Sequence, residues 1–145
     1  MVSTGRLVQA LGGKGVLRER QATTYEAIID KARAGLPYAT LEALAARFEI
    51  PQEILVRVLH LPPRTLARRK KSRRLSAGES DRLLRLARVV ARAEEVFGSQ
   101  ERAGAWLRGT VRALGGIRPL DLLDTDLGAQ QVERVLGRIE HGVYS

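Results

Sequence analysis

Apolar side chains recur at helical spacing along most of this chain, and this periodicity limits the fold more than any other feature. The clearest example follows the i, i+3, i+4, i+7 pattern of one buried helix face and consists of Leu41, Leu44, Ala45 and Phe48. No segment alternates Val, Ile and Thr with polar residues as a strand does. A composition of 44% hydrophobic and 28% charged residues is typical of a folded globular protein. We therefore predict an all-α protein.

Capping residues place the ends of several of these helices. Ser76 and Glu79 form a capping box, in which each side chain bonds a free backbone N–H of the first turn. Thr23 and Glu26 have the same spacing. The longest helix is expected to follow Ser76 and to end at Gly98. Four arginines of this helix are expected on its outer side: Arg82, Arg85, Arg88 and Arg92.

Most of the positive charge lies in one short run. Seven of the eleven residues from Arg64 to Arg74 are basic and none is acidic. Residues 1–63 carry eight basic and six acidic groups, and residues 75–145 carry ten of each, so the run supplies +7 of the net charge of +9. Such a concentration of charge indicates a polyanionic partner. Nucleic acid is the first candidate, because Lys and Arg release the counterions condensed on its phosphates.

The basic run forms the second half of a helix, tight break, helix arrangement over residues 52–71, which is typical of a helix-turn-helix. Val56 and His60 stand where this motif commonly has Ala and Gly. The second helix is expected to enter the major groove with Arg64, Thr65, Arg68 and Arg69. Residues at or beyond its end are expected to hold the phosphate backbone: Lys70, Lys71, Arg73 and Arg74. The alternative is a basic helix face that only contacts water.

Signs of catalysis or metal binding are weak. The two histidines, His60 and His141, lie far apart and have no metal-type partner at i+3 or i+4. The aspartates Asp121, Asp124 and Asp126 are interpreted as groups at helix starts, with an acid–base or metal site as the alternative. We predict that the chain is no enzyme and needs no metal or other cofactor.

The sequence also bears on where the protein works. It has no cysteine, no apolar stretch near the roughly 18 residues of a membrane span, and no apolar signal-peptide core at its N-terminus. These features predict a cytoplasmic protein that does not enter a membrane.

From Leu61 onward the sequence resembles the Xre-type antitoxins. The middle of the resemblance rests on Arg64-Thr65-Leu66, Leu75-Ser76, Glu79-Ser80-Asp81-Arg82-Leu83 and Ala93-Glu94-Glu95-Val96-Phe97-Gly98. Its second part is similar to the toxin-binding domain of the MbcA/ParS/Xre type, on Trp106-Leu107, Leu114-Gly115-Gly116, Pro119-Leu120-Asp121-Leu122-Leu123-Asp124-Thr125, Gly128, Val132, Leu136, Ile139-Glu140 and Gly142. Thr110-Val111 departs from the Pro-Asn that is usual after the Trp-Leu pair.

The resemblance implies an antitoxin that neutralises a RES-domain toxin, a NAD-degrading relative of ADP-ribosyltransferases, and represses its own operon by binding operator DNA. It implies a helix-turn-helix domain over residues 1–75, a small helical toxin-binding domain over residues 76–145, and a homodimer inside a larger complex. In the family the C-terminal end lies at the toxin's active site, which points here to Arg138, Glu140, His141, Gly142, Val143, Tyr144 and Ser145. A helix-turn-helix regulator without a toxin is the alternative.

Overall fold

A computed structural model describes residues 2–18 and 24–142 of the chain. Within these ranges every regular element is helical, which confirms the all-α prediction, and β pairing is limited to the isolated bridges Pro37–Arg74 and Val111–Ile117. The elements are α1 (Thr4–Ala10), α2 (Lys14–Leu17), α3 (Tyr25–Ala34), α4 (Tyr38–Phe48), α5 (Gln52–Val58), α6 (Pro63–Ser72), α7 (Ala77–Phe97), α8 (Gln100–Arg108), the 3-10 turns η1 (Arg112–Leu114) and η2 (Pro119–Leu122), and α9 (Asp126–Glu140).

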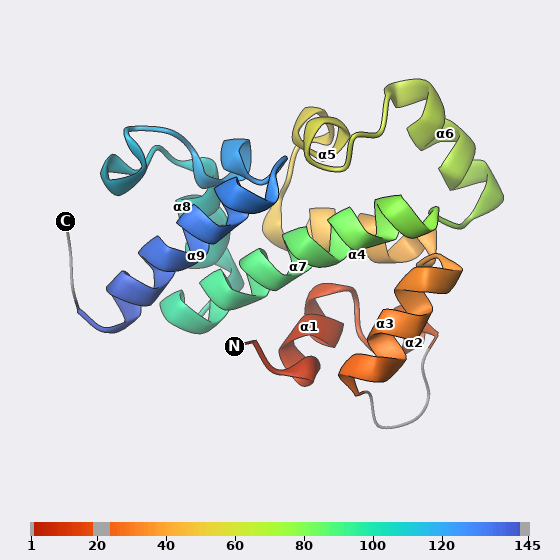
Figure 1. Cartoon of the computed structure of the whole chain (residues 1–145), viewed down its shortest axis with the longest axis horizontal. Helices are drawn as coiled ribbons and strands as arrows, with labels where there is room; N and C mark the ends of the chain where they lie inside the picture. Colours follow the sequence, from red (N-terminus) through yellow and green to blue (C-terminus); the bar gives the residue numbers. More distant parts are fainter. Residues whose placement is uncertain (1, 19–23, 143–145) are drawn as a thin grey trace.

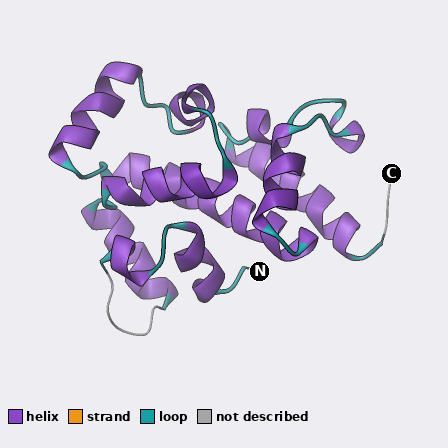
Figure 2. Ribbon diagram, turned by 180° about the vertical axis from the view of Figure 1, so that it is seen from behind, coloured by secondary structure: helices purple, strands orange, loops and turns teal. Residues whose placement is uncertain are grey.

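The long helix α7 organises the molecule. It packs against α1, α3 and α4 of the first part of the chain and against α8 and α9 of the second part (Figures 1 and 2). The predicted capping box of Ser76 and Glu79 is present, and Gly98 ends the helix with φ 81°. Helix α3 is capped by Thr24, whose Oγ1 accepts from the N–H of Ala27 at 3.1 Å. The expected cap at Thr23 lies outside the described residues.

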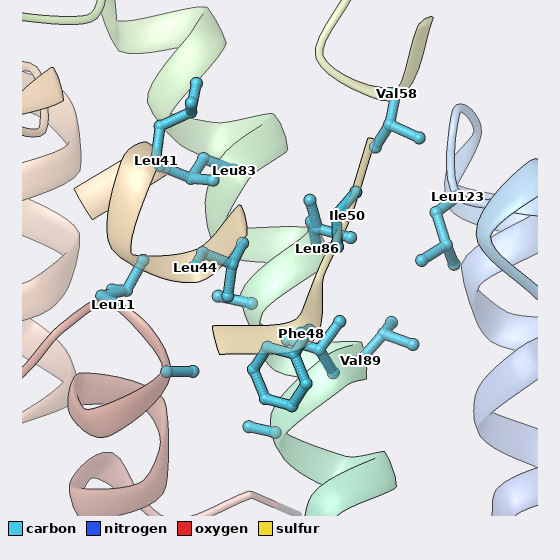
Figure 3. Close-up of a cluster of buried hydrophobic side chains, with 14 of the residues drawn as sticks. Leu11, Leu41, Leu44, Phe48, Ile50, Val58, Leu83, Leu86, Val89 and Leu123 are labelled. Atoms are coloured by element: carbon cyan, nitrogen blue, oxygen red, sulfur yellow. The ribbon is translucent and has the colours of Figure 1, made fainter. Parts of the chain in front are cut away.

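One apolar core joins the two parts of the chain. Buried side chains from before residue 75, such as Phe48, lie in the same cluster as Leu86 of α7 and Leu123 of the segment before α9 (Figure 3). Each fully buried Leu or Phe stabilises the fold by roughly 1.5–3 kcal/mol. Residues 1–75 and 76–145 therefore cannot separate without exposing a shared core.

The expectation that four arginines of α7 lie on its outer side was wrong. These side chains, which we call the arginine ladder, are half-buried: Arg82, Arg85, Arg88 and Arg92. Arg82 donates to the carbonyl of Leu59 at 2.8 Å, and Arg85 donates to the carbonyl of Asp124 at 3.4 Å. Arg88 donates to the carboxylate of Glu133 at 2.8 Å, and Arg92 donates to that of Glu140 at 2.6 and 2.8 Å. Elements cover α7 on several sides, and an arginine can lay its aliphatic stem on such a surface while its guanidinium reaches a partner. The ladder thus joins α7 to α5 and to α9.

Among the helices of the described ranges, none combines the length and the apolar character that crossing a bilayer requires.

Candidate functional site

Helix α6 carries the basic run and projects from one end of the molecule (Figure 1). Pro63 is its first residue, where the missing N–H would have no partner in any case, and Leu66 is its one buried side chain. In the break before α6, the backbone of His60 adopts a left-handed conformation with a φ of 52°. In Figure 1 α5 is seen nearly end-on while α6 runs across the view, so the two helices cross steeply. This is the arrangement expected for the two helices of a helix-turn-helix.

The exposed face of α6 is basic. At roughly 100° per residue, Arg68 and Lys71 lie within about 40° of Arg64 around the helix axis, whereas Leu66 lies about 160° away. Arg64, Arg68 and Lys71 are all exposed, and Thr65 beside them is half-buried. We call the first three the cationic face. They can meet a phosphate backbone or base edges without disturbing the contact that Leu66 makes with the core.

Arg69, which was also predicted to contact DNA, is bound to an internal carboxylate. Its Nε and Nη2 donate to both carboxylate oxygens of Glu79, at 2.8 and 3.2 Å. Only 27% of the Arg69 side chain and 7% of the Glu79 side chain are exposed. Arg69 lies about 140° around the helix from Arg64, toward the body of the protein. The bidentate pair fixes the rotation of α6 against the start of α7.

Glu79 is held charged by this arrangement. Burial alone would raise its pKa, but the hydrogen bonds from Arg69 and from the backbone N–H of Ser76 outweigh burial and lower the pKa below the ordinary glutamate value. One carboxylate therefore closes the capping box of α7 and anchors α6 at the same time.

The C-terminal end of α6 is tied to the start of α4. The N–H of Tyr38 donates to the carbonyl of Arg73 at 3.0 Å, and the N–H of Leu75 donates to the carbonyl of Leu36 at 2.9 Å. The Arg74 guanidinium also donates to the carbonyl of Ala34 at 3.4 Å. Of the expected backbone-holding residues, Lys71 thus belongs to the cationic face, while Lys70, Arg73 and Arg74 are exposed on the flank of α6.

The helix-turn-helix break contacts the second part of the chain. Arg57 of α5 pairs with Asp121 of η2, and His60 Nε2 lies 3.2 Å from the carbonyl oxygen of Asp124. Arg118 also binds Asp121, at 2.8 and 3.0 Å, and its hydrogen bond lowers the pKa of that carboxyl.

The three aspartates that cluster in the sequence, Asp121, Asp124 and Asp126, each have a structural role. Asp121 is an ion-pair partner, Asp124 contributes its backbone carbonyl, and Asp126 lies in the first turn of α9. Across residues 2–18 and 24–142 no group of three or more His, Asp or Glu side chains is placed to hold a metal.

The end of α9, which carries the described part of the expected toxin-binding segment, lies at the other end of the molecule from α6 (Figures 1 and 2). Helix α9 buries Val132, Val135 and Leu136, as its periodicity predicts. Arg138, Glu140, His141 and Gly142 are exposed, although Glu140 is bound by Arg92, whose hydrogen bonds lower the pKa of the carboxyl. Val143, Tyr144 and Ser145 lie outside the described residues.

Comparison with known proteins identifies both parts of the chain. Residues 27–88 match the family model of the antitoxin Xre-like helix-turn-helix domain, and residues 92–142 match that of the antitoxin Xre/MbcA/ParS C-terminal toxin-binding domain. An antitoxin Xre of Yersinia enterocolitica is 32% identical over 120 residues, 81% of each chain. The chain belongs to the Xre antitoxin family.

Other relatives agree with this assignment. An antitoxin Xre of Photorhabdus laumondii is 32% identical over 113 residues, covering 77% of this chain and 76% of the relative. A protein of Sphingobium named Prs ADP-ribosylating antitoxin is 30% identical over 123 residues, covering 78% and 77%. The resemblance predicted from residues 61–145 is thereby confirmed, and the family implies a toxin partner and DNA binding for this Xre-family antitoxin.

In this Xre-family chain α7 serves both matched domains. The helix-turn-helix match ends at residue 88 and the toxin-binding match begins at residue 92, both inside α7. Sequence reasoning did not find the arginine ladder or the Arg57–Asp121 pair, because their partners lie 23 to 64 residues apart. The residues next to each arginine in the sequence do not indicate a partner that lies so far along the chain.

Proposed function

We propose that this antitoxin belongs to a type II toxin–antitoxin pair, that it neutralises a RES-type, NAD-degrading toxin with its C-terminal end, and that it represses its own operon through α6. The observation that carries the proposal is the separation of two chemically different ends. One presents the cationic face of α6, and the other presents the end of α9.

Operon repression is supported by the geometry of α6. Its exposed side carries Arg64, Arg68 and Lys71, while Leu66 and the Arg69–Glu79 pair hold the opposite side. A rigid helix with this division can insert its basic side in a major groove without rearranging. Arg64 and Arg68 are the base-reading candidates, and Arg69 positions them through Glu79.

Toxin neutralisation is supported by the end of α9. Arg138, His141 and Gly142 are exposed there, and the Arg92–Glu140 pair fixes the last turn of the helix from which the terminus leaves. Val143, Tyr144 and Ser145 complete the proposed plug, with Tyr144 as a large anchor that carries a hydroxyl. A relative's name includes ADP-ribosylating, which is compatible with a toxin that acts on NAD.

Two further statements belong to the proposal. Operators are commonly bound by two-fold symmetric dimers that present one recognition helix to each half-site, so we propose that the antitoxin is a homodimer. We also propose that it works in the cytoplasm, where the operator and the toxin meet.

The test uses two variants and two assays. Truncation after Gly142 removes Val143–Ser145 and none of the described contacts, so it should leave operator binding intact and abolish rescue of cells that express the toxin from the adjacent gene. Arg64→Gln/Arg68→Gln should do the reverse, weakening operator binding about 100-fold in a gel shift at physiological salt. Full rescue by the truncated protein, or unchanged operator affinity of the double variant, would refute the corresponding half of the proposal. A wild-type protein that binds DNA but protects no cell would instead be a regulator without a toxin.

A further inference from the structure

We propose that a cationic cavity beside the flank of α6 binds a phosphate of the DNA backbone, with Arg18 and Lys31 as contact residues that lie outside α5 and α6, the two helices of the helix-turn-helix motif. The inference rests on the proposed DNA binding and extends the contact surface from α6 to α2 and α3. No sequence feature assigns a role to either residue.

The cavity has a strongly one-sided charge. Its volume is about 310 Å³, roughly ten times the share of a water molecule in the liquid, which is about 30 Å³. Among the described residues that line it are four cations, Arg18, Lys31, Arg73 and Arg74, and no carboxylate. Four like charges around one cavity repel one another, and an anion between them removes that cost.

The cavity continues along α6. A neighbouring hollow of about 270 Å³ shares Arg18, Pro37 and Arg73 with it and adds Lys70. Among the described residues that line this hollow, Glu42 is the one that is acidic. Five cations from the ends of α2, α3 and α6 therefore surround two adjoining spaces. Two adjoining spaces surrounded by cations suit consecutive phosphates of one backbone better than a single small anion.

The backbone that carries Arg73 and Arg74 is firmly held. The bridge between Pro37 and Arg74 ties the end of α6 to the start of α4. Gly35 allows this close approach, because it has a φ of 100° and because a Cβ there would collide with the carbonyl oxygen of Leu75. Arg73 and Arg74 are thus presented by a preorganised backbone, so less ordering free energy is lost when they bind.

DNA is the occupant that the arrangement favours over a free nucleotide. Three of the five cations, Lys70, Arg73 and Arg74, come from the end of the helix that carries the cationic face. The cavity and that face therefore lie on adjoining sides of one helix, as contacts to a backbone and to the groove beside it must.

The experiment compares Arg18→Gln/Lys31→Gln with Lys14→Gln/Arg33→Gln. The control removes the same two charges from α2 and α3, but neither of its residues lines the cavities, and Arg33 is 77% exposed beside Asp30. Affinity for the promoter duplex and for a random duplex of equal length is measured from 50 to 300 mM salt, and thermal melting shows that both variants fold.

The cavity variant should bind both duplexes about tenfold more weakly at physiological salt, by the same factor for each. Its log–log salt slope should be shallower than that of wild type by about 1–2, since each lost phosphate contact removes roughly 0.9. The control should lose clearly less affinity and keep its slope. A cavity variant that behaves like the control, while Arg64→Gln/Arg68→Gln still strongly weakens operator binding, would overturn this inference and leave the proposed function standing.

A titration with inorganic pyrophosphate decides the source of the phosphate. Tight pyrophosphate binding to wild type that the cavity variant loses, together with unchanged DNA affinity, would assign the cavity to a small polyphosphate and refute a DNA contact. Wild-type protein that binds no duplex at all would refute the proposed function itself.

Discussion

Gly128 is the residue of α9 that tolerates a side chain least. A Cβ at this position would overlap the carbonyl of Leu122, and the Gly128 N–H is already committed to Thr125 Oγ1 at 3.0 Å. Gly137, in the same helix, would place a Cβ in open space.

We therefore expect opposite effects from one substitution at two glycines. Gly128→Ala should lower the free energy of unfolding by about 1–3 kcal/mol through overpacking. Gly137→Ala should raise it by about 0.5–1 kcal/mol, because alanine restricts the unfolded chain and favours helix. Urea denaturation of the two variants measures both changes, and shifts of the same sign would contradict the packing at the start of α9.

The lowered pKa of Glu79 makes part of the stability depend on pH. A carboxyl whose pKa is lower in the folded than in the unfolded protein stabilises the fold fully above its unfolded pKa, and this contribution is lost as the pH falls through the folded pKa. Glu79→Gln should cost about 1.5–3 kcal/mol at pH 7, because both the charge-assisted bonds to Arg69 and the capping box are weakened.

Urea denaturation at pH 7 and pH 3 checks this prediction. The difference between wild type and Glu79→Gln should shrink at pH 3, because the pH is then below the ordinary glutamate pKa and the stability that the charge contributes falls with pH. The exposed Glu101→Gln of α8 serves as the control. An equal difference at both pH values would show that charge on Glu79 contributes nothing.

At the scale of single elements, α6 depends on very few contacts. Its apolar anchor is Leu66 and its polar anchor is the Arg69–Glu79 pair. Leu66→Ala should therefore release α6 selectively, at a cost of roughly 2–5 kcal/mol for the helix. Amide exchange of residues 63–72 should accelerate strongly while the centre of α7 keeps its protection. Uniform acceleration of both helices would contradict the view that α6 is a separately anchored unit.

The elements also show what can be read from sequence. The starts of α7, α8 and α9 were predictable, because Ser76, Ser99 and Thr125 cap N–H groups only three residues ahead. The basic side of α6 was likewise visible from its composition. Three other features could not be predicted, because they depend on how distant helices pack. They are the partner of Arg69, the arginine ladder and the approach of Lys31 to Arg74.

At the scale of the whole molecule, the two proposed binding ends share one core. Phe48, Leu86 and Leu123 belong to a single cluster, and Arg57 with Asp121 links the helix-turn-helix directly to the second half. The proposed boundary after residue 75 therefore separates two surfaces rather than two independently folding bodies. Helix α7 contacts both ends, through the Arg69–Glu79 pair at its start and the Arg92–Glu140 pair farther along.

The charge distribution fits the same division. The seven basic groups of residues 64–74 lie at one end, and residues 75–145 are neutral overall. Attraction to DNA should therefore depend strongly on salt, whereas capture of the toxin by a neutral surface should depend on apolar contacts and a few placed polar groups.

Hydrogen–deuterium exchange on the full chain, alone, with operator DNA and with the toxin, tests this division most directly. We expect DNA to slow exchange in residues 63–74 and the toxin to slow exchange from the end of α9 to the chain terminus. Protection of residues 63–74 by the toxin, with exchange beyond residue 137 unchanged, would contradict the assignment of the two ends.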